Sequence, residues 1–410
     1  MALPKTWQHV RHHVFRRRRI PRFNSIDITR GRPSRSAVPA VEIPQFLKDC
    51  GHDYLETTMD DNGCPELTSA MKELEKLRTE TERFHSQQLS VHNLKHNPRL
   101  FKFYTNLPNF DVFNALREYL ETRANGNVKR WHGSKAAVEL RNENVTGMRK
   151  FCRGSKLSFE NELFLILVKL KTGRLNQDLA FQFCVSIGYI SELFTSWMCF
   201  LHSELKLLFE MIDCGDTVDG LPSVYKNLSA LRIIIDCTEL MLQKSSDLQE
   251  RKETFSNYKH RDTVKFLVGM SPHLYVNFVS KAWAGRASDK HITMNSDALL
   301  GGLPPGSVVM ADRGFTVTAE LSKLGVKTVI PAFKGRGRSQ FTAAECSSSE
   351  DIARTRIHIE RAIQRIRTFH ILGSVVKMNM CDIIEQIFAV CAYMTNFQTP
   401  IINLNEIKPV

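Results

Sequence analysis

Three acidic residues stand in surroundings where a carboxylate needs a specific partner. Asp236 interrupts the apolar run IIIDCTEL, Asp312 ends the segment VVMAD, and Glu360 lies among isoleucines at helical spacing in RIHIERAIQRIR. A carboxylate that loses its hydration inside such a run must be compensated. Three carboxylates together offer the hard oxygen donors that Mg²⁺ or Mn²⁺ prefers, and two such ions about 4 Å apart support phosphodiester cleavage. The residue types therefore predict metal-dependent phosphodiester chemistry, with these three as metal ligands and catalytic residues.

Each of these carboxylates also has an ordinary structural explanation. Asp236 would pair with a lysine inside a core, Asp312 would cap a turn, and Glu360 would exchange i,i+4 contacts with Arg356. The order of the surrounding elements favours the catalytic interpretation, because it predicts that the three positions converge.

The pattern of residues from 231 onward predicts an alternation of strands and helices in the order βββαβαβα. This order is typical of an α/β domain of the ribonuclease-H-like type, in which the first strand, the fourth strand and the last helix meet. We expect this catalytic domain over residues 230–400. Its strands are expected at 231–242, 264–270, 275–280, 308–311 and 327–331, and its helices at 288–300, 318–324 and 350–369.

Three shorter apolar patterns precede this domain, at 159–170, 176–184 and 189–201. Gly173, an N-cap at Asn176 and a turn ending at Gly188 separate them, which predicts a helix-turn-helix domain over residues 156–215. The other interpretation is an ordinary three-helix bundle, because the last helix offers no Arg or Lys to guanine or phosphate.

A helical region is expected over residues 46–155. The segment 67–89 is rich in helix formers and places Met71, Leu74, Leu77 and Phe84 on one stripe. A short coiled coil, and with it a homo-oligomer, is one interpretation, and a single helix that packs locally is the other. The segment 101–108 predicts a loop, and 109–122 predicts a helix.

The composition indicates a polyanionic partner and argues against a membrane protein, a zinc site and an organic cofactor. The 410 residues carry a net charge of +13, which suits DNA but also fits a merely basic protein. No apolar run approaches the roughly 20 residues of a membrane helix, so no membrane role is expected. The ten cysteines lack the spacing of a zinc site, and nothing indicates an organic cofactor.

Basic residues surround the acidic positions and the N-terminus. Residues 1–45 are expected to form a disordered basic region, whose Arg16–Arg19 run favours either nuclear import or phosphate binding. We take the nucleus as the expected location. A phosphate-facing wall is predicted from the following residues, although solvated surface charge explains them nearly as well: Lys259, Arg261, Lys265, Lys334, Arg336, Arg338, Arg361 and Arg365.

Five short motifs occur in an order that resembles the DDE superfamily endonucleases related to Harbinger transposases, including animal types joined to a THAP zinc domain. The motifs are DCTE at 236–239, FSNYK at 255–259, GRASDK at 285–290, VMADRGF at 309–315 and RIHIER at 356–361. The resemblance covers the helix-turn-helix segment and residues 231–397.

That resemblance implies a DDE triad of Asp236, Asp312 and Glu360, with Asp289 as a further metal ligand. It implies hydrolysis that nicks the DNA at the end of a transposable element, followed by attack of the freed 3′-hydroxyl on target DNA. The N-terminus lacks the C2CH zinc arrangement of a THAP domain, while the stretch from Arg35 to Val41 resembles the box that ends one. Some members of the group use a Myb-like helper protein, and that partner stays open here.

Two other functions remain as alternatives. One is a domesticated DNA-binding or scaffold protein that keeps the fold without catalysis. The other is a different enzyme on the same fold, such as a ribonuclease or an exonuclease. The complete acidic triad favours the endonuclease over both.

Overall fold

The computed structural model describes residues 65–87, 89–124, 128, 157–210, 225, 230–312, 314–331 and 343–401. The chain divides into two compact units, one spanning residues 16–88 and the other containing everything from residue 89 onward. The predicted basic region 1–45, with its arginine run, lies outside the described residues.

Helix α3 (Pro65–Gln87) is the described part of the smaller unit. It confirms the helix predicted from residue 67, and Met71, Leu74 and Leu77 are more than half exposed along it. The side chain of Phe84 lies outside the described residues. The coiled coil therefore stays a prediction.

The helices α4 (Val91–Leu94), α5 (Pro98–Thr105) and α6 (Phe110–Arg123) open the larger unit. The predicted loop at 101–108 was wrong over its first half, because Asn97 caps α5 and Pro98 occupies its first turn. The helix ends where Asn106 adopts a left-handed conformation. The side chain of Phe101 is fully buried and meets Phe113 of α6 edge to face.

The next three helices confirm the predicted helical patterns. They are α8 (Phe159–Thr172), α9 (Asn176–Gln182) and α10 (Ile187–Phe209), and a 107° bend separates α9 from α10. This angle is typical of a helix-turn-helix. Ser186 caps α10 as an acceptor, whereas the predicted cap at Asn176 was wrong, because its side chain accepts a hydrogen bond from Lys169 instead.

Helix α8 is buried on all sides from Glu162 to Leu170, so it forms the centre of the helical region. Inside it, the Glu162 carboxylate accepts hydrogen bonds from Tyr189 and from the indole of Trp197. Among the described helices, none alone is long and apolar enough to span a membrane, and only the bent pair α9 and α10 passes that test together.

The sheet is built around the long strand β1 (Leu231–Met241), which pairs with β3 on one side and β6 on the other. Its path runs β2-β3-β1-β6-β7, and β4 and β5 also pair with β3. The pairs of β3 are antiparallel, while β1-β6 and β6-β7 are parallel. The remaining strands are β2 (Phe255–Ser256), β3 (Arg261–Met270), β4 (Val276–Val279), β5 (Trp283–Ala284), β6 (Val308–Met310) and β7 (Lys327–Val329).

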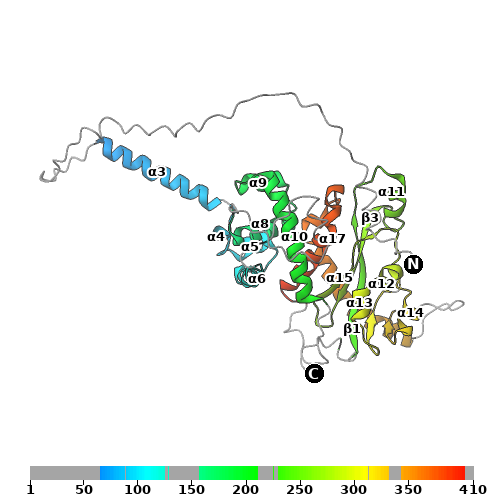
Figure 1. The fold of residues 1–410 in the computed structure, drawn as a ribbon. Helices are drawn as coiled ribbons and strands as arrows, with labels where there is room; N and C mark the ends of the chain where they lie inside the picture. The colour runs from blue at the N-terminus through cyan, green and yellow to red at the C-terminus, as the bar shows by residue number, and fades with distance from the viewer. Residues whose placement is uncertain are drawn as a thin grey trace, which may run out of the picture. The chain divides into compact units, whose positions relative to one another are not determined.

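Helices cover both faces of this sheet (Figure 1). Ile234 and the even-numbered residues of β3 from Val264 to Met270 pack into a core shared with α10, α15 (Ala343–Arg367) and α17 (Ile384–Met394). Ile233 and Ile235 point to the other face and pack with α12 (Asp289–Met294), α13 (Asp297–Gly301) and α14 (Thr318–Lys323). From Ile233 to Ile235 the two-residue alternation of a strand thus assigns successive β1 side chains to opposite cores.

The predicted strands and helices are present, with insertions that the sequence pattern did not indicate. Helix α11 (Leu248–Thr254) and β2 lie between the first two long strands, and β5 follows β4. The predicted helix at 288–300 is divided into α12 and α13, and α15 begins at Ala343 rather than 350. After α15 come α16 (His370–Gly373), η2 (Met378–Ile383), α17 and η3 (Thr395–Phe397).

Gly285 lies where β5 passes close to α11, and this contact leaves no room for a side chain. A Cβ at this position would stand 2.1 Å from the Thr263 hydroxyl and 2.5 Å from the backbone oxygen of Thr254. We expect Gly285→Ala to lower the free energy of unfolding by about 2–3 kcal/mol, because the backbone must shift to accept the methyl group.

Urea unfolding followed by circular dichroism measures this change. Gly301→Ala is the matched control, since a Cβ there meets nothing within 4 Å. Equal unfolding midpoints for the two variants would show that the space between Gly285 and residues Thr254 and Thr263 can accept a methyl group.

Candidate active site

Asp236 lies in the middle of β1, on the face of the sheet that α15 covers. It is paired with Val268 of β3 across the antiparallel ladder, and it is two residues beyond Ile234 on the same face. The backbone N–H of Cys237 donates a hydrogen bond of 2.8 Å to its Oδ1. The strand therefore holds the carboxylate rigidly.

Asp312 follows β6, the parallel neighbour of β1. Ile234 is level with Met310 in the ladder, so Asp236 within β1 and Asp312 just after β6 are each two positions beyond this pair. The Phe315 N–H donates to the Asp312 backbone oxygen and closes a turn directly after it. Asp312 thus stands at the carboxyl end of a parallel strand, where α/β sheets keep their ligands.

Glu360 comes from α15, whose Ile359 is fully buried against the sheet. One turn earlier on the same helix, Arg356 reaches both carboxylates. Its Nη1 lies 2.8 Å from Asp312 Oδ1, and its Nη2 lies 3.5 Å from Glu360 Oε1. Arg356 therefore bridges Asp312 and Glu360, and the charges of all three residues act on Asp236.

The electrostatics of Asp236 show how closely the acidic groups are gathered. Burial raises its pKa to about 6, while the Cys237 N–H and the charge of Arg356 act in the opposite direction. The negative charges of Asp312 and Glu360 raise this pKa further. A cation added to the cluster would relieve this repulsion.

Arg356 supplies that positive charge in the structure. Its side chain is 12% exposed, whereas those of Asp312 and Glu360 are about half exposed. In the described part of the chain, no group of three His, Cys, Asp or Glu side chains has the geometry of a metal site. The guanidinium thus stands in for a cation among oxygen donors that suit Mg²⁺ or Mn²⁺.

We expect Arg356→Gln to destabilise the metal-free protein by about 1–2 kcal/mol, because two neighbouring carboxylates lose their counter-charge. Added Mn²⁺ should then raise the melting temperature more in this variant than in the wild type, since no guanidinium competes for the carboxylates. Thermal unfolding in EDTA and in Mn²⁺ measures both effects.

Arg361→Gln, an exposed position on the same helix, is the control for loss of one positive charge. If the two variants have the same melting temperature in EDTA and the same one in Mn²⁺, Arg356 is not the counter-ion of Asp312 and Glu360.

Asp289, the fourth residue predicted to bind metal, does not join the other three. Its Oδ1 accepts a hydrogen bond of 3.3 Å from Lys265, and the same ammonium lies 3.3 Å from Glu239. Alternate residues of a strand point to opposite faces of the sheet, and Lys265 and Glu239 are odd-numbered residues of β3 and β1. Asp289 is the first residue of α12, which packs on the face that carries the odd-numbered residues. This group therefore belongs to the face opposite Asp236. Ser288 caps α12 through its hydroxyl, which accepts a hydrogen bond from the His291 N–H.

The Asp289 group lies beside the active-site turn even though it occupies the other face. A Cβ at Gly314 would stand 3.9 Å from Asp289 Oδ2. Burial, and after it the charge of Asp289, raises the pKa of the Cys237 thiol well above its ordinary value. The metal-binding role of Asp289 stays a prediction.

The predicted phosphate-contacting cations have different surroundings. Lys259, Arg261 and Arg361 are exposed, and the Lys259 ammonium lies 4.6 Å from the centre of the Tyr258 ring. Lys265 is held between two carboxylates, and Arg365 donates to the backbone oxygens of Thr399 and Pro400. A DNA contact by either of these two would have to replace such bonds. Lys334, Arg336 and Arg338 lie outside the described residues.

The sequence did not predict all the contacts that two residues near the site, Arg356 and Glu239, make. Arg356 was expected as an i,i+4 partner of Glu360, and it also bridges to Asp312. Glu239 belongs to the DCTE motif, and its carboxylate binds both the Lys265 ammonium and the Thr263 hydroxyl. The i,i+4 spacing was a signal for the first contact, while no local signal indicates the others.

Comparison with known families assigns both parts of the larger unit. Residues 235–396 match the family model of the DDE superfamily endonuclease, and residues 155–207 match the helix-turn-helix of DDE superfamily endonuclease. No curated protein matches the chain. Asp236, Asp312 and Glu360 all lie inside the first match. Over these residues, the chain belongs to the DDE superfamily endonucleases.

Proposed function

We propose that this protein is a divalent-metal-dependent DNA endonuclease of the transposase type, with Asp236, Asp312 and Glu360 as its catalytic metal ligands. The observation that carries the proposal is the meeting of these three carboxylates around Arg356, within the residues that match the endonuclease family.

The donor set fits a divalent metal. Asp236 is held by the Cys237 N–H, Asp312 by a turn, and Glu360 by a packed helix, so the three oxygens come from rigid elements. Mg²⁺ or Mn²⁺ bound by them would supply a polarised water and charge stabilisation at the leaving oxygen of a phosphodiester. By holding that positive charge in a fixed position, the carboxylates would orient the attacking water and the phosphate.

The ribonuclease-H-like fold is the architecture we infer for residues 230–400. The strand order β4-β3-β1-β6-β7, with β3 antiparallel to its neighbours, supports this assignment. So does the position of α15, which contacts β1 and carries Glu360 across the sheet face. Strand transfer by the freed 3′-hydroxyl, and a Harbinger-like subtype, belong to the same proposal.

Residues 156–215 are proposed as the DNA-recognition module. The bend between α9 and α10 supports this role, and Ser191 and Glu192 are exposed near the start of α10. Ser196 is buried and its hydroxyl bonds to the helix backbone, so it is unsuited to reading a base. A nuclear location, suggested by the Arg16–Arg19 run, and a homo-oligomer, suggested by the stripe of α3, are further parts of the proposal.

Nicking of supercoiled plasmid DNA tests the proposal directly. The full chain is incubated with the plasmid in Mn²⁺, in Mg²⁺ and in EDTA, and the fraction of plasmid converted to the relaxed circular form is measured over time. We expect relaxation in either metal and none in EDTA. DNA binding without relaxation in any metal would overturn the endonuclease and favour a domesticated binding protein, while cleavage of RNA in preference to DNA would favour a ribonuclease.

A further inference from the structure

A basic pocket lies at the end of β1 away from the parallel strands, where α11 and β2 are inserted. Its volume is about 480 Å³, the size of a site for a small organic group. We call it the α11 pocket, and it is lined by Lys244, Leu248, Arg251, Lys252, Phe255, Asn257, His260, Arg261, Asp262 and Arg286.

The charge of the α11 pocket is strongly positive. Lys244, Arg251, Lys252, Arg261 and Arg286 contribute five cations, against the single carboxylate of Asp262. Asp262 is 4% exposed, and its Oδ1 accepts from the Thr254 hydroxyl. Within the described residues, none of the five cations forms an ion pair with a carboxylate. Like charges gathered in this way repel one another unless an anion joins them.

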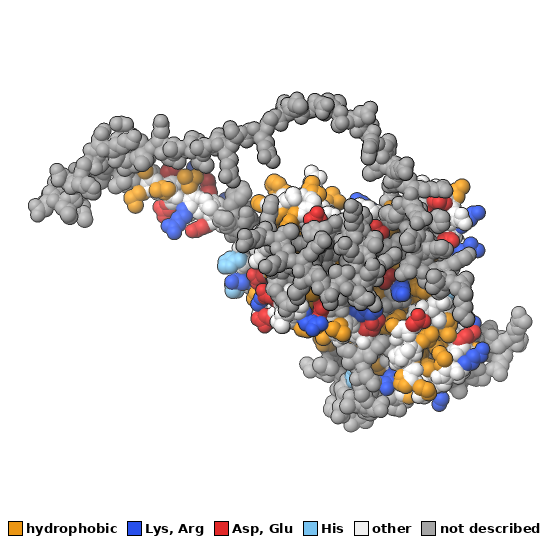
Figure 2. Space-filling view, viewed as in Figure 1, with side chains coloured by type: hydrophobic (Ala, Val, Ile, Leu, Met, Phe, Trp, Pro, Cys, Tyr) orange, Lys and Arg blue, Asp and Glu red, His pale blue; other side chains and the backbone are white. Residues whose placement is uncertain are grey.

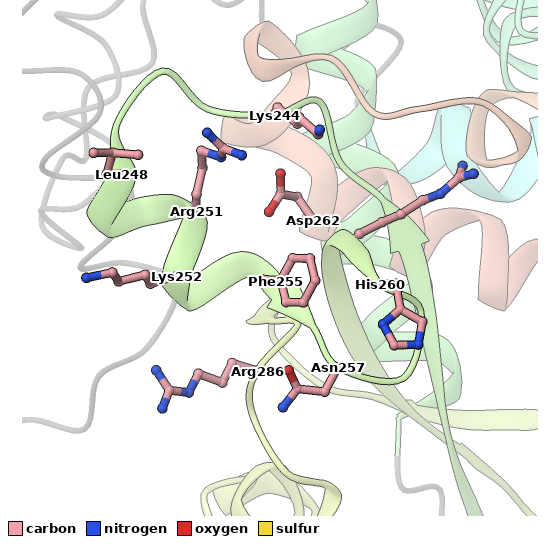
Figure 3. A pocket seen from close by; sticks show the side chains of 10 residues that line it. Lys244, Leu248, Arg251, Lys252, Phe255, Asn257, His260, Asp262 and Arg286 are labelled. Atoms are coloured by element: carbon pink, nitrogen blue, oxygen red, sulfur yellow. The ribbon is translucent and has the colours of Figure 1, made fainter.

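The pocket also offers apolar surface between its cations. The Phe255 side chain is 40% exposed and that of Leu248 is 71% exposed. In Figure 3 the Phe255 ring lies in the middle of the pocket, with Arg251 and Asp262 to one side and Arg286 and Asn257 to the other. Figure 2 shows Lys and Arg side chains on the surface around α11. An aromatic face flanked by guanidinium groups is the combination that binds a nucleotide through its base and its phosphate.

We propose that the α11 pocket binds an unpaired nucleotide of the DNA strand that the active site processes. Its cations hold the phosphates, and the base lies against Phe255. The concave shape favours an unpaired nucleotide over duplex DNA, since a base inside the helical stack cannot enter a pocket. This inference rests on the proposed DNA substrate.

The register of the sheet relates the pocket to the carboxylates. Met241, which precedes the pocket, is five residues beyond Asp236 along β1, or about 17 Å at the rise of a strand. A stacked nucleic-acid strand advances about 3.4 Å per phosphate, so roughly five nucleotides span the distance from Asp236 to Met241 along β1.

The test is binding of a labelled oligothymidylate single strand, and of a duplex of the same length, by the full chain. Fluorescence anisotropy is measured in EDTA, so that the result does not depend on cleavage. We expect the single strand to bind more tightly than the duplex. Arg251→Gln with Arg286→Gln should weaken single-strand binding roughly tenfold or more, and Phe255→Ala roughly 5- to 100-fold.

Two further variants separate stacking from charge and from misfolding. Phe255→Tyr should keep single-strand affinity, because the aromatic face is retained. Lys323→Gln with Lys327→Gln removes the same charge from an exposed region around α14 and β7, and should change affinity little. Thermal melts check that each variant folds.

The outcomes distinguish this inference from the proposed function. If Phe255→Ala leaves affinity unchanged, or if the arginine variant weakens single strand and duplex equally, the pocket does not hold an unpaired nucleotide. Competition by inorganic phosphate alone, with no effect of Phe255→Ala, would also overturn it and indicate an anion site. Selective single-strand binding in a protein that cuts no plasmid would support the pocket while the endonuclease proposal fails.

Discussion

Asp236→Asn and Glu360→Gln are each expected to slow metal-dependent DNA nicking by roughly 1,000-fold or more, about 4 kcal/mol in the barrier. Both changes keep the shape of the side chain and remove one negative charge from the cluster around Arg356. Without that charge the remaining carboxylates bind the metal weakly and position it poorly. Single-turnover nicking of supercoiled plasmid in Mn²⁺ measures the rate.

The same variants should fold as well as the wild type. Burial raises the pKa of Asp236, so its ionised form is disfavoured by the folded protein, and a neutral Asn relieves that cost while still accepting from the Cys237 N–H. Asp297→Asn, an exposed carboxylate on α13, is the control and should cut normally. Wild-type cutting by either triad variant would remove that residue from the proposed mechanism.

Phe266→Ala is expected to lower the free energy of unfolding by about 3–5 kcal/mol. Phe266 of β3 and Phe388 of α17 stack with their ring centres 4.0 Å apart, and both are essentially inaccessible to solvent. Removing one ring leaves a cavity between the sheet and the helix that covers it. Urea unfolding measures the loss.

Phe181→Ala provides the matched control, because its side chain is 86% exposed and its loss should change stability by no more than about 0.5 kcal/mol. Phe388→Ala should resemble Phe266→Ala, and the double variant should lose less than the sum, since the two rings share one contact. A loss below about 1 kcal/mol for Phe266→Ala would mean that α17 is not anchored through this pair.

The fold was predictable where the residue pattern was long and regular. The β-branched run of β1, the strands β3 and β6 and the helix α15 were all expected close to where they lie. The pattern did not indicate α11 or β2, because QKSSDLQERKETFSNYK is polar and its helix has only seven residues. Helix α5 was partly missed for a related reason, since its eight residues are defined by the caps at Asn97 and Asn106 rather than by periodicity.

The three acidic residues could be identified from the chain alone, since each stands in a local pattern that assigns it to a strand, a strand end or a helix. Their convergence followed from the order of those elements. The contacts of Arg356 with Asp312, and the α11 pocket, depend on residues far apart in the sequence that strand register and helix packing bring together. The surroundings of Asp289 show the same dependence, because the pleat of β1 and β3 directs Glu239 and Lys265 to the face where α12 holds it. Local residue patterns encode which groups can do chemistry, whereas the face of the sheet each one occupies is set by long-range pairing.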